Sequence, residues 1–536
     1  MPKITKHVLC SIPFQQHRRL RFCGSVILAL AWLALNAARA QTTNYALGAS
    51  ALLVGPAAGS NSIVLAVTPP TGAWTATANA TWLHLSAANQ SGTGSTNVVF
   101  TYDANPGATR SGTLTVAGQT LTVTQAPTNY VAAAVGTLAS SGLEPGYGIA
   151  VDGADNVYYS VTDLHSMKEW TAANNTVTTL ASGLGLPYGL AVDGAGNVYI
   201  AESHANWIRE WTAANSNLIT LVSSGLNDPM AVAVDGDGNV YIADTGNLAV
   251  KKWTAANRNV ITLVSGLHGP SGVAVDGAGN VYFSEAYGNT LKEWTAASGN
   301  VITLVSGLRF PRGVAVDGAG NVYIADTVNN AVKEWTAANG NVITLASGLN
   351  SPWSVAADVA GNVYIADWQF VKELPHAFVD PTPKLEGLAA GSDALPGVLP
   401  ATENLLPPLT PTSDQSWLTI TGITNDVVSF SFTANTGPAR TAHINLLGQS
   451  IPITQGVIGT PPSFTGAQMM GNGVVQFAFT NTPGASFTVL STTDLSLPLS
   501  DWAVAGTATN TSPEVFQFTS QPTTNDAQRF YGVRSP

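Results

Sequence analysis

The sequence predicts an all-β protein in which a six-bladed β-propeller is flanked by β-sandwich domains. A short phrase ending in aspartate recurs six times at spacings of 41, 42, 41, 41 and 41 residues. A repeat of about forty residues with short apolar runs and Gly/Asn turns is typical of propellers and solenoids. Only 10% of the residues are charged, which suits an extracellular all-β protein better than a cytosolic enzyme. The recurring aspartates are Asp152, Asp193, Asp235, Asp276, Asp317 and Asp358.

Each repeat divides into four short strands, as the unit from Gly307 to Ser347 illustrates. The strands predicted there are Gly313–Val316, Asn321–Asp326, Ala331–Trp335 and Asn341–Ala346. Asp-Gly-x-Gly-Asn joins the first two strands and Thr-Ala-Ala-Asn joins the last two in most units. Gly and Asn tolerate the positive φ that such turns need. Four antiparallel strands per unit form a propeller blade.

The two ends of the array indicate a closed ring. The sixth unit stops at its third strand, Val371–Leu374, and the missing strand occurs ahead of the first unit, at Val135–Ser140. The N-terminal strand is therefore expected to complete the last blade. Closure removes the unpaired strand edges that an open solenoid would expose. The propeller is predicted to span residues 130–378.

The phrase Gly-Val-Ala-Val-Asp-Gly-Ala-Gly-Asn-Val-Tyr-Ile-Ala-Asp-Thr-x-Asn-Asn resembles the NHL repeat, and all six units match it. The resemblance implies a propeller that serves in most family members as a binding platform and in a minority as an enzyme, such as lyases that hold zinc through histidines. Fold alone does not assign a site.

Residues 1–40 read as a secretory signal peptide. A basic start is followed by the apolar Gly24–Leu35 and by Ala38-Arg39-Ala40, a cleavage motif before Gln41. The alternative is an uncleaved anchor, but twelve apolar residues are too few to cross a bilayer. We therefore expect a secreted or cell-surface bacterial protein, with no membrane insertion after signal cleavage.

Removal of this segment changes the cysteine count and the charge. Both cysteines, Cys10 and Cys23, lie in it, so the mature chain has no disulfide and no thiolate metal site. It also carries six of the 21 basic residues and none of the 32 acidic ones, so the net charge moves from −11 to −17. An acidic surface of this kind argues against nucleic acid and anionic lipid as partners.

Three further modules are predicted around the propeller. Residues 41–127 contain TWLHLS, SGTGSTNVVFTYDANPGATRSGTLTV and AGQTLTVTQA, and resemble the BACON domain. That family is an immunoglobulin-like sandwich of secreted bacterial proteins, and the resemblance implies carbohydrate or mucin binding. Residues 382–456 resemble a second BACON domain, and residues 461–536 resemble a small fibronectin- or immunoglobulin-like sandwich. Trp74 and Trp82 either stack on sugars or fill the sandwich core, and burial is the usual state of Trp.

Comparison of the six repeats separates two faces of the propeller. The Asp-Gly-x-Gly-Asn and Thr-Ala-Ala-Asn turns share one nearly invariant face, which we call the turn face. The other connections share the opposite face, which we call the variable face. The variable face predicts a ligand site, because aromatic residues and an arginine gather at the channel mouth; neutral variation of exposed loops is the alternative. The predicted ligand-binding residues are Tyr147, Tyr188, Met230, Arg312, Trp353, His204, Tyr287 and Trp368, with Ser271, Asp163, Gly246 and Val328 at equivalent positions.

Acidic residues end most second strands on the variable face. They predict either a cation-binding collar or carboxylates that accept backbone N–H groups of the following loop, and their regularity favours the structural interpretation. They are Glu202, Asp244, Glu285, Asp326 and Asp367. A tryptophan column is expected to pack between blades. It contains Trp170, Trp211, Trp253, Trp294 and Trp335, with Leu374 in the last blade.

These patterns favour a secreted, non-catalytic protein that binds an extracellular glycan or a peptide or protein ligand through the variable face. The alternatives are an NHL-type lyase or lactonase-like enzyme with a metal in the channel, and a structural or adhesive envelope protein. The propeller histidines, His165, His204, His268 and His376, occupy four different repeat positions, so no symmetric ring supplies three ligands. We predict no catalytic residue, no cofactor and no metal ligand.

Overall fold

The computed structural model describes residues 42–139, 146–368, 370–403, 405–456, 463–470, 473–480, 487–498, 501–512, 515–521 and 528–534. The predicted signal peptide lies outside the described residues. Within them, the regular structure is β-strand apart from four 3-10 turns. These are η1 (Ala87–Asn89), η2 (Thr162–Leu164), η3 (Thr245–Asn247) and η4 (Thr327–Asn329). No helix among these residues has the length and apolarity to cross a membrane.

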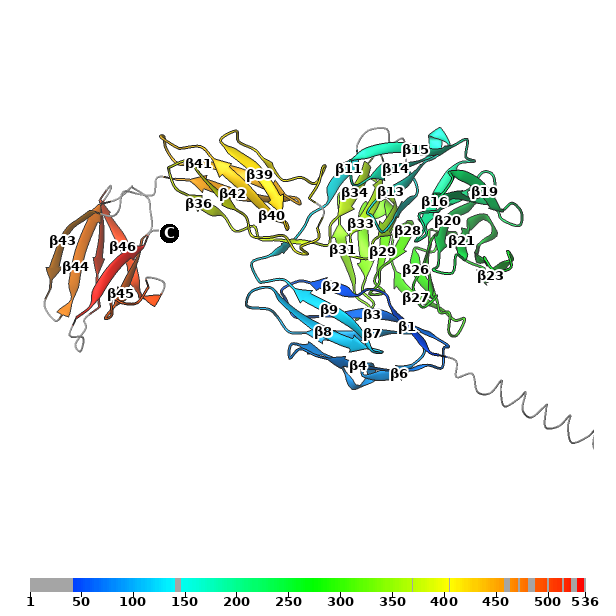
Figure 1. Ribbon diagram of the computed structural model, residues 1–536, viewed down its shortest axis with the longest axis horizontal. Coiled ribbons are helices and arrows are strands. Elements are labelled where there is room, and N and C mark those ends of the chain that lie inside the picture. Colours follow the sequence, from blue (N-terminus) through cyan, green and yellow to red (C-terminus); the bar gives the residue numbers. More distant parts are fainter. Residues whose placement is uncertain are drawn as a thin grey trace, which may run out of the picture.

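Six four-stranded antiparallel sheets form a β-propeller, as the repeat predicts (Figure 1). The first three blades contain β12 (Ile149–Val151), β13 (Val157–Val161), β14 (Ser166–Thr171), β15 (Thr176–Ser182), β16 (Pro187–Val192), β17 (Val198–Glu202), β18 (Trp207–Thr212), β19 (Asn217–Val222), β20 (Pro229–Val234), β21 (Val240–Asp244), β22 (Ala249–Trp253) and β23 (Val260–Ser265). The last three contain β24 (Pro270–Val275), β25 (Val281–Glu285), β26 (Thr290–Trp294), β27 (Val301–Ser306), β28 (Pro311–Val316), β29 (Val322–Asp326), β30 (Ala331–Trp335), β31 (Val342–Ala346), β32 (Pro352–Ala357), β33 (Val363–Asp367) and β34 (Phe370–Leu374).

The sixth blade takes its outermost strand from the N-terminal end of the propeller. β11 (Gly136–Ala139) pairs antiparallel with β34, which gives this blade the order β11-β34-β33-β32. A second short pair, β10 (Val131–Ala132) with β35 (Phe378–Val379), joins the two ends beside it. The ring is therefore closed by main-chain hydrogen bonds, and the sixth blade gains the fourth strand that its own repeat lacks.

A single polar network shapes every turn between first and second strands. In the second blade, Asp193 Oδ1 accepts the backbone N–H groups of Ala195 and Asn197, both at 2.9 Å. Tyr199 donates its hydroxyl to Asp193 Oδ2 at 3.2 Å, and Asn197 Oδ1 accepts Ala213 N–H from the neighbouring turn. Such aspartates act as turn residues by bonding to their own backbone. The repeated aspartate is thus part of the scaffold.

The tryptophan column packs each blade against the one before it. Trp211 of the second blade lies in a buried cluster with Ala150 and Tyr158 of the first. Trp170 of the first blade packs with Tyr364 of the sixth, so the column also runs across the closure. The indoles bury large apolar areas between sheets, and the expected packing role is confirmed.

The N-terminal module is a sandwich of a four-stranded sheet, β1-β3-β7-β5, and a five-stranded sheet, β2-β9-β8-β4-β6. Its strands are β1 (Asn44–Leu47), β2 (Ala51–Val54), β3 (Gly59–Thr68), β4 (Ala73–Ala78), β5 (Leu83–His84), β6 (Ser91–Thr93), β7 (Thr96–Tyr102), β8 (Arg110–Val116) and β9 (Gln119–Gln125). Trp74 and Trp82 are buried in its core, which supports the packing interpretation over a sugar platform.

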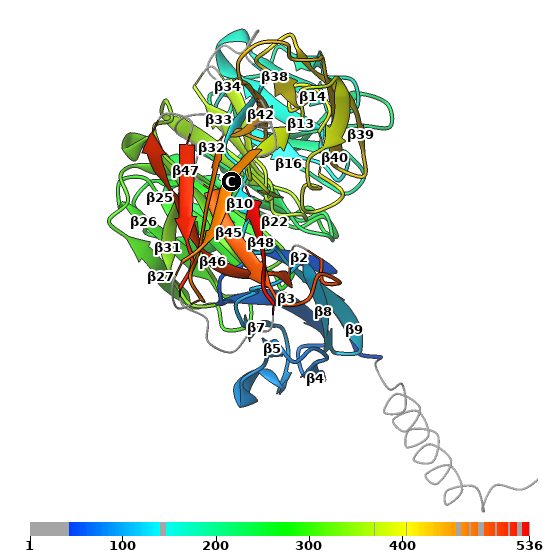
Figure 2. The same ribbon diagram turned by 90° about the vertical axis from the view of Figure 1, so that its left-hand side faces the viewer.

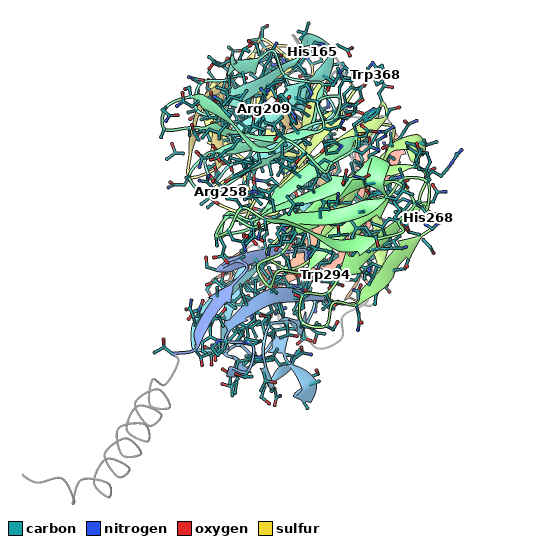
Figure 3. All side chains as sticks on the ribbon, turned by 90° about the vertical axis from the view of Figure 1, so that its right-hand side faces the viewer. His165, Arg209, Arg258, His268, Trp294 and Trp368 are labelled. Atoms are coloured by element: carbon teal, nitrogen blue, oxygen red, sulfur yellow. The ribbon has the colours of Figure 1, made fainter. Side chains whose placement is uncertain are left out.

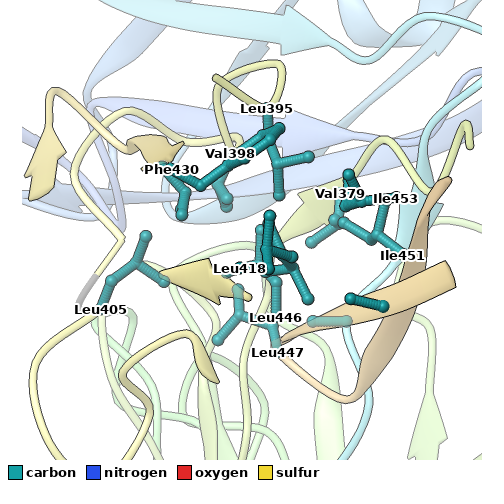
Figure 4. Packing of buried hydrophobic residues seen from close by; sticks show 14 of the residues in the cluster. Val379, Leu395, Val398, Leu405, Leu418, Phe430, Leu446, Leu447, Ile451 and Ile453 are labelled. Atoms are coloured by element: carbon teal, nitrogen blue, oxygen red, sulfur yellow. The ribbon is translucent and has the colours of Figure 1, made fainter. Parts of the chain in front are cut away.

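The second sandwich has sheets β36-β42-β41-β38 and β37-β40-β39 around the core shown in Figure 4. Its strands are β36 (Lys384–Glu386), β37 (Gly391–Ala394), β38 (Thr412–Ser413), β39 (Leu418–Thr424), β40 (Val427–Phe432), β41 (Arg440–Leu446) and β42 (Gln449–Gln455). Arg440 lies over Trp417 at 4.3 Å and donates to Gln455. Arg110 lies over Trp82 at 4.4 Å and donates to Gln125, so the two sandwiches share one motif.

The C-terminal module is a six-stranded sheet in the order β43-β44-β47-β46-β45-β48. Its strands are β43 (Ser463–Met469), β44 (Val475–Thr480), β45 (Phe487–Thr492), β46 (Ala503–Ser512), β47 (Val515–Thr519) and β48 (Phe530–Arg534). β46 pairs with β45 through its first half and with β47 through its second. One buried core contains phenylalanines of β44, β45 and β47, including Phe479, Phe487 and Phe516.

Both BACON-like sandwiches contact the turn face of the propeller (Figures 1 and 2). The first meets the fifth blade, where Val64 N–H donates to Gly318 O at 3.0 Å and Ser62 Oγ donates to Ala319 O at 2.6 Å. The second lies against the first blade, where Glu403 shares a cavity with Asp155. The invariant turns therefore also serve as docking sites.

Gly318 is expected to be indispensable for the first of these contacts. A Cβ on Gly318 would lie 2.3 Å from Gly48 O, whereas one on Gly277, the same position in the fourth blade, would meet nothing within 4 Å. We predict that Gly318→Ala costs about 1–3 kcal/mol through overpacking. Thermal unfolding and limited proteolysis near residue 130 measure this, with Gly277→Ala as the matched control. Equal effects of the two variants would contradict the contact.

The contact with the second sandwich is predicted to weaken as pH rises. Burial, together with the nearby carboxylates of Asp358, Asp426 and Asp155, raises the pKa of Glu403 to about 8, and Glu373 faces the same group. An unfolded glutamate titrates near about 4.3. The folded state therefore binds more protons between these values, and its stability falls as pH rises from about 4 to 8. Melting curves should show this fall, and Glu403→Gln should reduce it; an unchanged slope would contradict it.

Candidate functional site

A β-bulge opens the innermost strand of each blade from the second to the sixth. The register shifts between Pro187 and Leu190 in β16 and between Pro352 and Ser354 in β32, for example. The predicted site residues Tyr188, Met230, Arg312 and Trp353 therefore lie inside the strands, one position after the proline, rather than just ahead of them as expected. A bulge bends the strand and re-aims the side chains beside it.

Three aromatic residues from the first, second and sixth blades meet at one channel mouth. The rings of Tyr147 and Tyr188 are stacked, with centroids 4.9 Å apart. Trp353 meets Tyr147 edge-on at 4.0 Å and Tyr188 at 6.4 Å. All three side chains are half-buried. They are brought together only because the ring closes between the first and sixth blades.

Arg312 of the fifth blade completes this cluster, which we call the aromatic mouth. Its guanidinium lies 3.3 Å above the ring of Trp353 and 4.8 Å from that of Phe310. Burial lowers the pKa of Arg312 to about 10, an effect opposed by Tyr188, Tyr147 and Tyr287. The group remains a cation at neutral pH. Cation–π contacts of this kind contribute about 0.5–2 kcal/mol each.

The other predicted residues lie farther round the variable face. Met230 is half-buried in β20, and His204 is exposed after β17. Tyr287 is 71% exposed and meets Phe310 edge-on at 5.3 Å. Trp368 is 37% exposed, and its φ is 51°. The structure thus joins Tyr147, Tyr188, Arg312 and Trp353 directly, and links Tyr287 to them through Phe310.

Sequence reasoning missed Phe310, which supports both Arg312 and Tyr287. It precedes the proline that opens β28 and adopts a φ of 52°. The same column holds Leu186, Asp228 and Ser351, so Phe310 is the aromatic exception in it. Comparison of this position across the repeats would have identified Phe310 from the sequence.

The channel beneath the mouth is lined by aliphatic side chains of the innermost strands. Each strand contributes three consecutive residues, such as Ile149-Ala150-Val151 and Val314-Ala315-Val316, around a cavity of about 170 Å³. This wall offers no titratable group or hydrogen-bonding side chain. The polar side chains of this column are therefore found at the mouth and not in the channel.

The acidic residues that end the second strands are buried structural partners. Asp326 is fully buried, accepts Arg309 N–H at 2.7 Å and lies 2.8 Å from Lys333 Nζ. Its backbone donor belongs to the preceding loop, seventeen residues upstream, rather than to the following loop as predicted. Four other blades repeat the pair through Glu202–Arg209, Asp244–Lys251, Glu285–Lys292 and Asp367–Lys372.

Family models match three parts of this chain. The BACON model, described as "Putative binding domain, N-terminal", matches residues 72–126 and 410–456. The NHL repeat model matches residues 308–335, the fifth unit, whose phrase the other five share. The chain combines an NHL-repeat propeller with BACON domains. No curated protein matches it.

Solved structures similar to the chain include three bacterial proteins. A gluconolactonase from Xanthomonas campestris is 18% identical, with a TM-score of 0.41 over 45% of this chain and 89% of that one. Virginiamycin B lyase from Staphylococcus aureus is 13% identical, with a TM-score of 0.37 over 46% and 97%. A protein of unknown function from Bacteroides thetaiotaomicron is 17% identical, with a TM-score of 0.42 over 62% and 98%.

The histidines of the NHL propeller are scattered. In Figure 3, His165 lies at the top of the propeller and His268 at its right-hand side, well apart from each other. His165 Nδ1 is 2.9 Å from Leu184 O, and His376 Nε2 is 2.9 Å from Leu53 O of the first sandwich. Among the described residues, no group of three or more His, Cys, Asp or Glu side chains is placed to hold a metal ion.

The buried pair of the fifth blade yields a stability prediction. Asp326→Ala leaves Lys333 and Arg309 N–H without their acceptor, and we expect a loss of about 3 kcal/mol. Asp237→Ala, at an exposed turn position where the other repeats carry alanine, should change stability by less than about 0.5 kcal/mol. Chemical denaturation measures both. A rise in the wild-type melting temperature on addition of Ca²⁺ that Asp326→Ala abolishes would instead favour a cation collar.

Proposed function

We propose that this protein is a secreted, non-catalytic binding protein whose aromatic mouth recognises an extracellular glycan or a peptide. The observation that carries the proposal is the convergence of Tyr147, Tyr188 and Trp353, from three different blades, on one half-exposed cluster. Tyrosine, tryptophan and arginine are the residues that dominate binding energy at recognition sites.

The repeat pattern supports a functional origin for this cluster. Neighbouring columns hold the same residue in most blades because each blade has the same neighbours, whereas the mouth column changes from blade to blade. Loops that vary neutrally would accumulate small polar residues. Here the variation has placed large rings where the channel opens.

The domain arrangement also supports the variable face as the binding surface. Among the described residues, the hydrogen bonds that join the sandwiches to the propeller involve its turn face or the closing strands, as at Gly318 and Ala134. The aromatic mouth lies on the opposite face, so docking leaves it accessible. The BACON modules are then proposed to place the propeller or to add carbohydrate contacts, and secretion rests on the signal-like residues 1–40.

Trp353→Ala and Tyr188→Ala are expected to weaken ligand binding by about tenfold or more each, since one aromatic stack contributes about 0.5–1.5 kcal/mol beyond its buried area. The measurement is a glycan-array and peptide-array screen of the full chain, followed by calorimetry on each hit. Ile343→Ala, at a 48% exposed position on the outer strand β31, is the control.

Two results would contradict the proposal. Unchanged affinity of both aromatic variants for every hit would exclude the mouth as the site. Stoichiometric, tightly bound zinc in the purified chain, together with turnover of a lactone or ester, would favour the enzymatic alternative.

A further inference from the structure

Arg312 carries a cationic group that the fold itself leaves unpaired. Its Nε is buried and has no hydrogen-bond partner. Within the part of the chain that the structure describes, no carboxylate forms an ion pair with it. The groups that stabilise its charge are phenols and ring faces. A partly buried charge without a counterion is costly unless a partner is supplied from outside.

Other propeller cations show what a structural arginine or lysine looks like here. Arg209, Lys292 and Lys333 occupy one repeat position, and each meets a buried carboxylate of the same blade within 3.2 Å. Arg312 lies outside that pattern, since the equivalent residues of its own column are Tyr188, Met230, Ser271 and Trp353. The scaffold therefore does not require a cation at this place.

We infer that Arg312 binds the carboxylate of an acidic sugar residue, a hexuronate, whose ring lies against the aromatic mouth. A guanidinium presents a planar fork that matches a carboxylate in two parallel hydrogen bonds. The Trp353 ring holds the guanidinium at the mouth, since Arg312 Cζ lies 3.3 Å from its centroid. The inference rests on the proposed function, because it names the ligand class of the same site.

The surroundings of Arg312 favour one carboxylate on a hydroxylated ring. Burial raises the pKa of Tyr147 and Tyr188, so both phenols keep their protons at neutral pH and are available as hydrogen-bond donors to a ligand. Asp163 and Asp228 lie close enough to raise those pKa values further, and they suit sugar hydroxyl donors. The chain has a net charge of −11, which opposes a polyanion but permits a single acidic terminus.

The test compares two disaccharides that differ only in the acidic group. Cellobiouronic acid, which carries a terminal glucuronate, and neutral cellobiose are titrated into the full chain by calorimetry at pH 7. We expect the acid to bind at least tenfold tighter, and Arg312→Met to remove that preference. Arg309→Met is the matched control, because Arg309 lies three residues away, is exposed and changes the net charge equally.

Folding does not confound this comparison. Arg312→Met removes a buried charge without a counterion but also two cation–π contacts, so the two effects offset and the melting temperature should change little while binding is lost. A preference for the acid that survives in Arg312→Met overturns the inference, as does equal binding of both disaccharides. Equal binding that is lost in Trp353→Ala leaves the proposed function in place and rejects only the hexuronate.

A peptide arm separates the remaining source of a carboxylate. A pentapeptide with a free C-terminus and its amidated form are titrated in the same way. Binding of the free peptide alone, dependent on Arg312, overturns the sugar assignment. Failure of every probe, with no other array hit that depends on the mouth, rejects the proposed function as well.

Discussion

The hydrogen bonds between β11 and β34 are the constraint on which the rest of the structure depends. They allow six blades with one repeated sequence to close a ring, and closure sets the first and sixth blades side by side. Tyr147 and Trp353 are 206 residues apart in the chain and meet only for this reason. The same seam fixes where the chain enters and leaves the propeller, and therefore where the two BACON sandwiches dock. The pairing of β11 with β34 thus determines which face of the propeller carries the sandwiches and which face stays open.

The positions of the repeat divide into those that maintain the scaffold and those that vary from blade to blade. Two polar arrangements recur inside the blades: the aspartate–asparagine–tyrosine turn and, in five blades, the carboxylate–cation pair. Buried polar groups are costly unless they are paired, so these positions tolerate little change. The bulge position in the second to sixth blades lies outside both recurring arrangements, and its residue changes from blade to blade. Variation is concentrated where the scaffold makes no demand.

A feature could be predicted from the sequence when the contacts that produce it recur in every repeat. Blade strands, ring closure and the tryptophan column depend on contacts that every repeat makes, and six copies reveal them without a structure. The bulge was missed, and the site column was placed one residue ahead of strands that in fact begin at the proline. The partner loop of Asp326 was assigned wrongly, because seventeen-residue contacts across a blade leave no local pattern. Gly318 read as an ordinary turn residue, since its special role arises only from contact with another module.

The description of the aromatic mouth draws on both the sequence and the structure. The sequence grouped Tyr147, Tyr188, Arg312 and Trp353 by repeat position, and the structure adds the stacking geometry, Phe310 and the missing counterion. The missing counterion carries the most weight, since five other blade cations in this propeller have a carboxylate partner and Arg312 does not. A propeller that pairs the cation of one repeat position with a carboxylate in five blades has no evident structural need for an unpaired cation at residue 312. We therefore interpret the unpaired guanidinium, at the end of an otherwise aliphatic channel, as the group that binds the ligand.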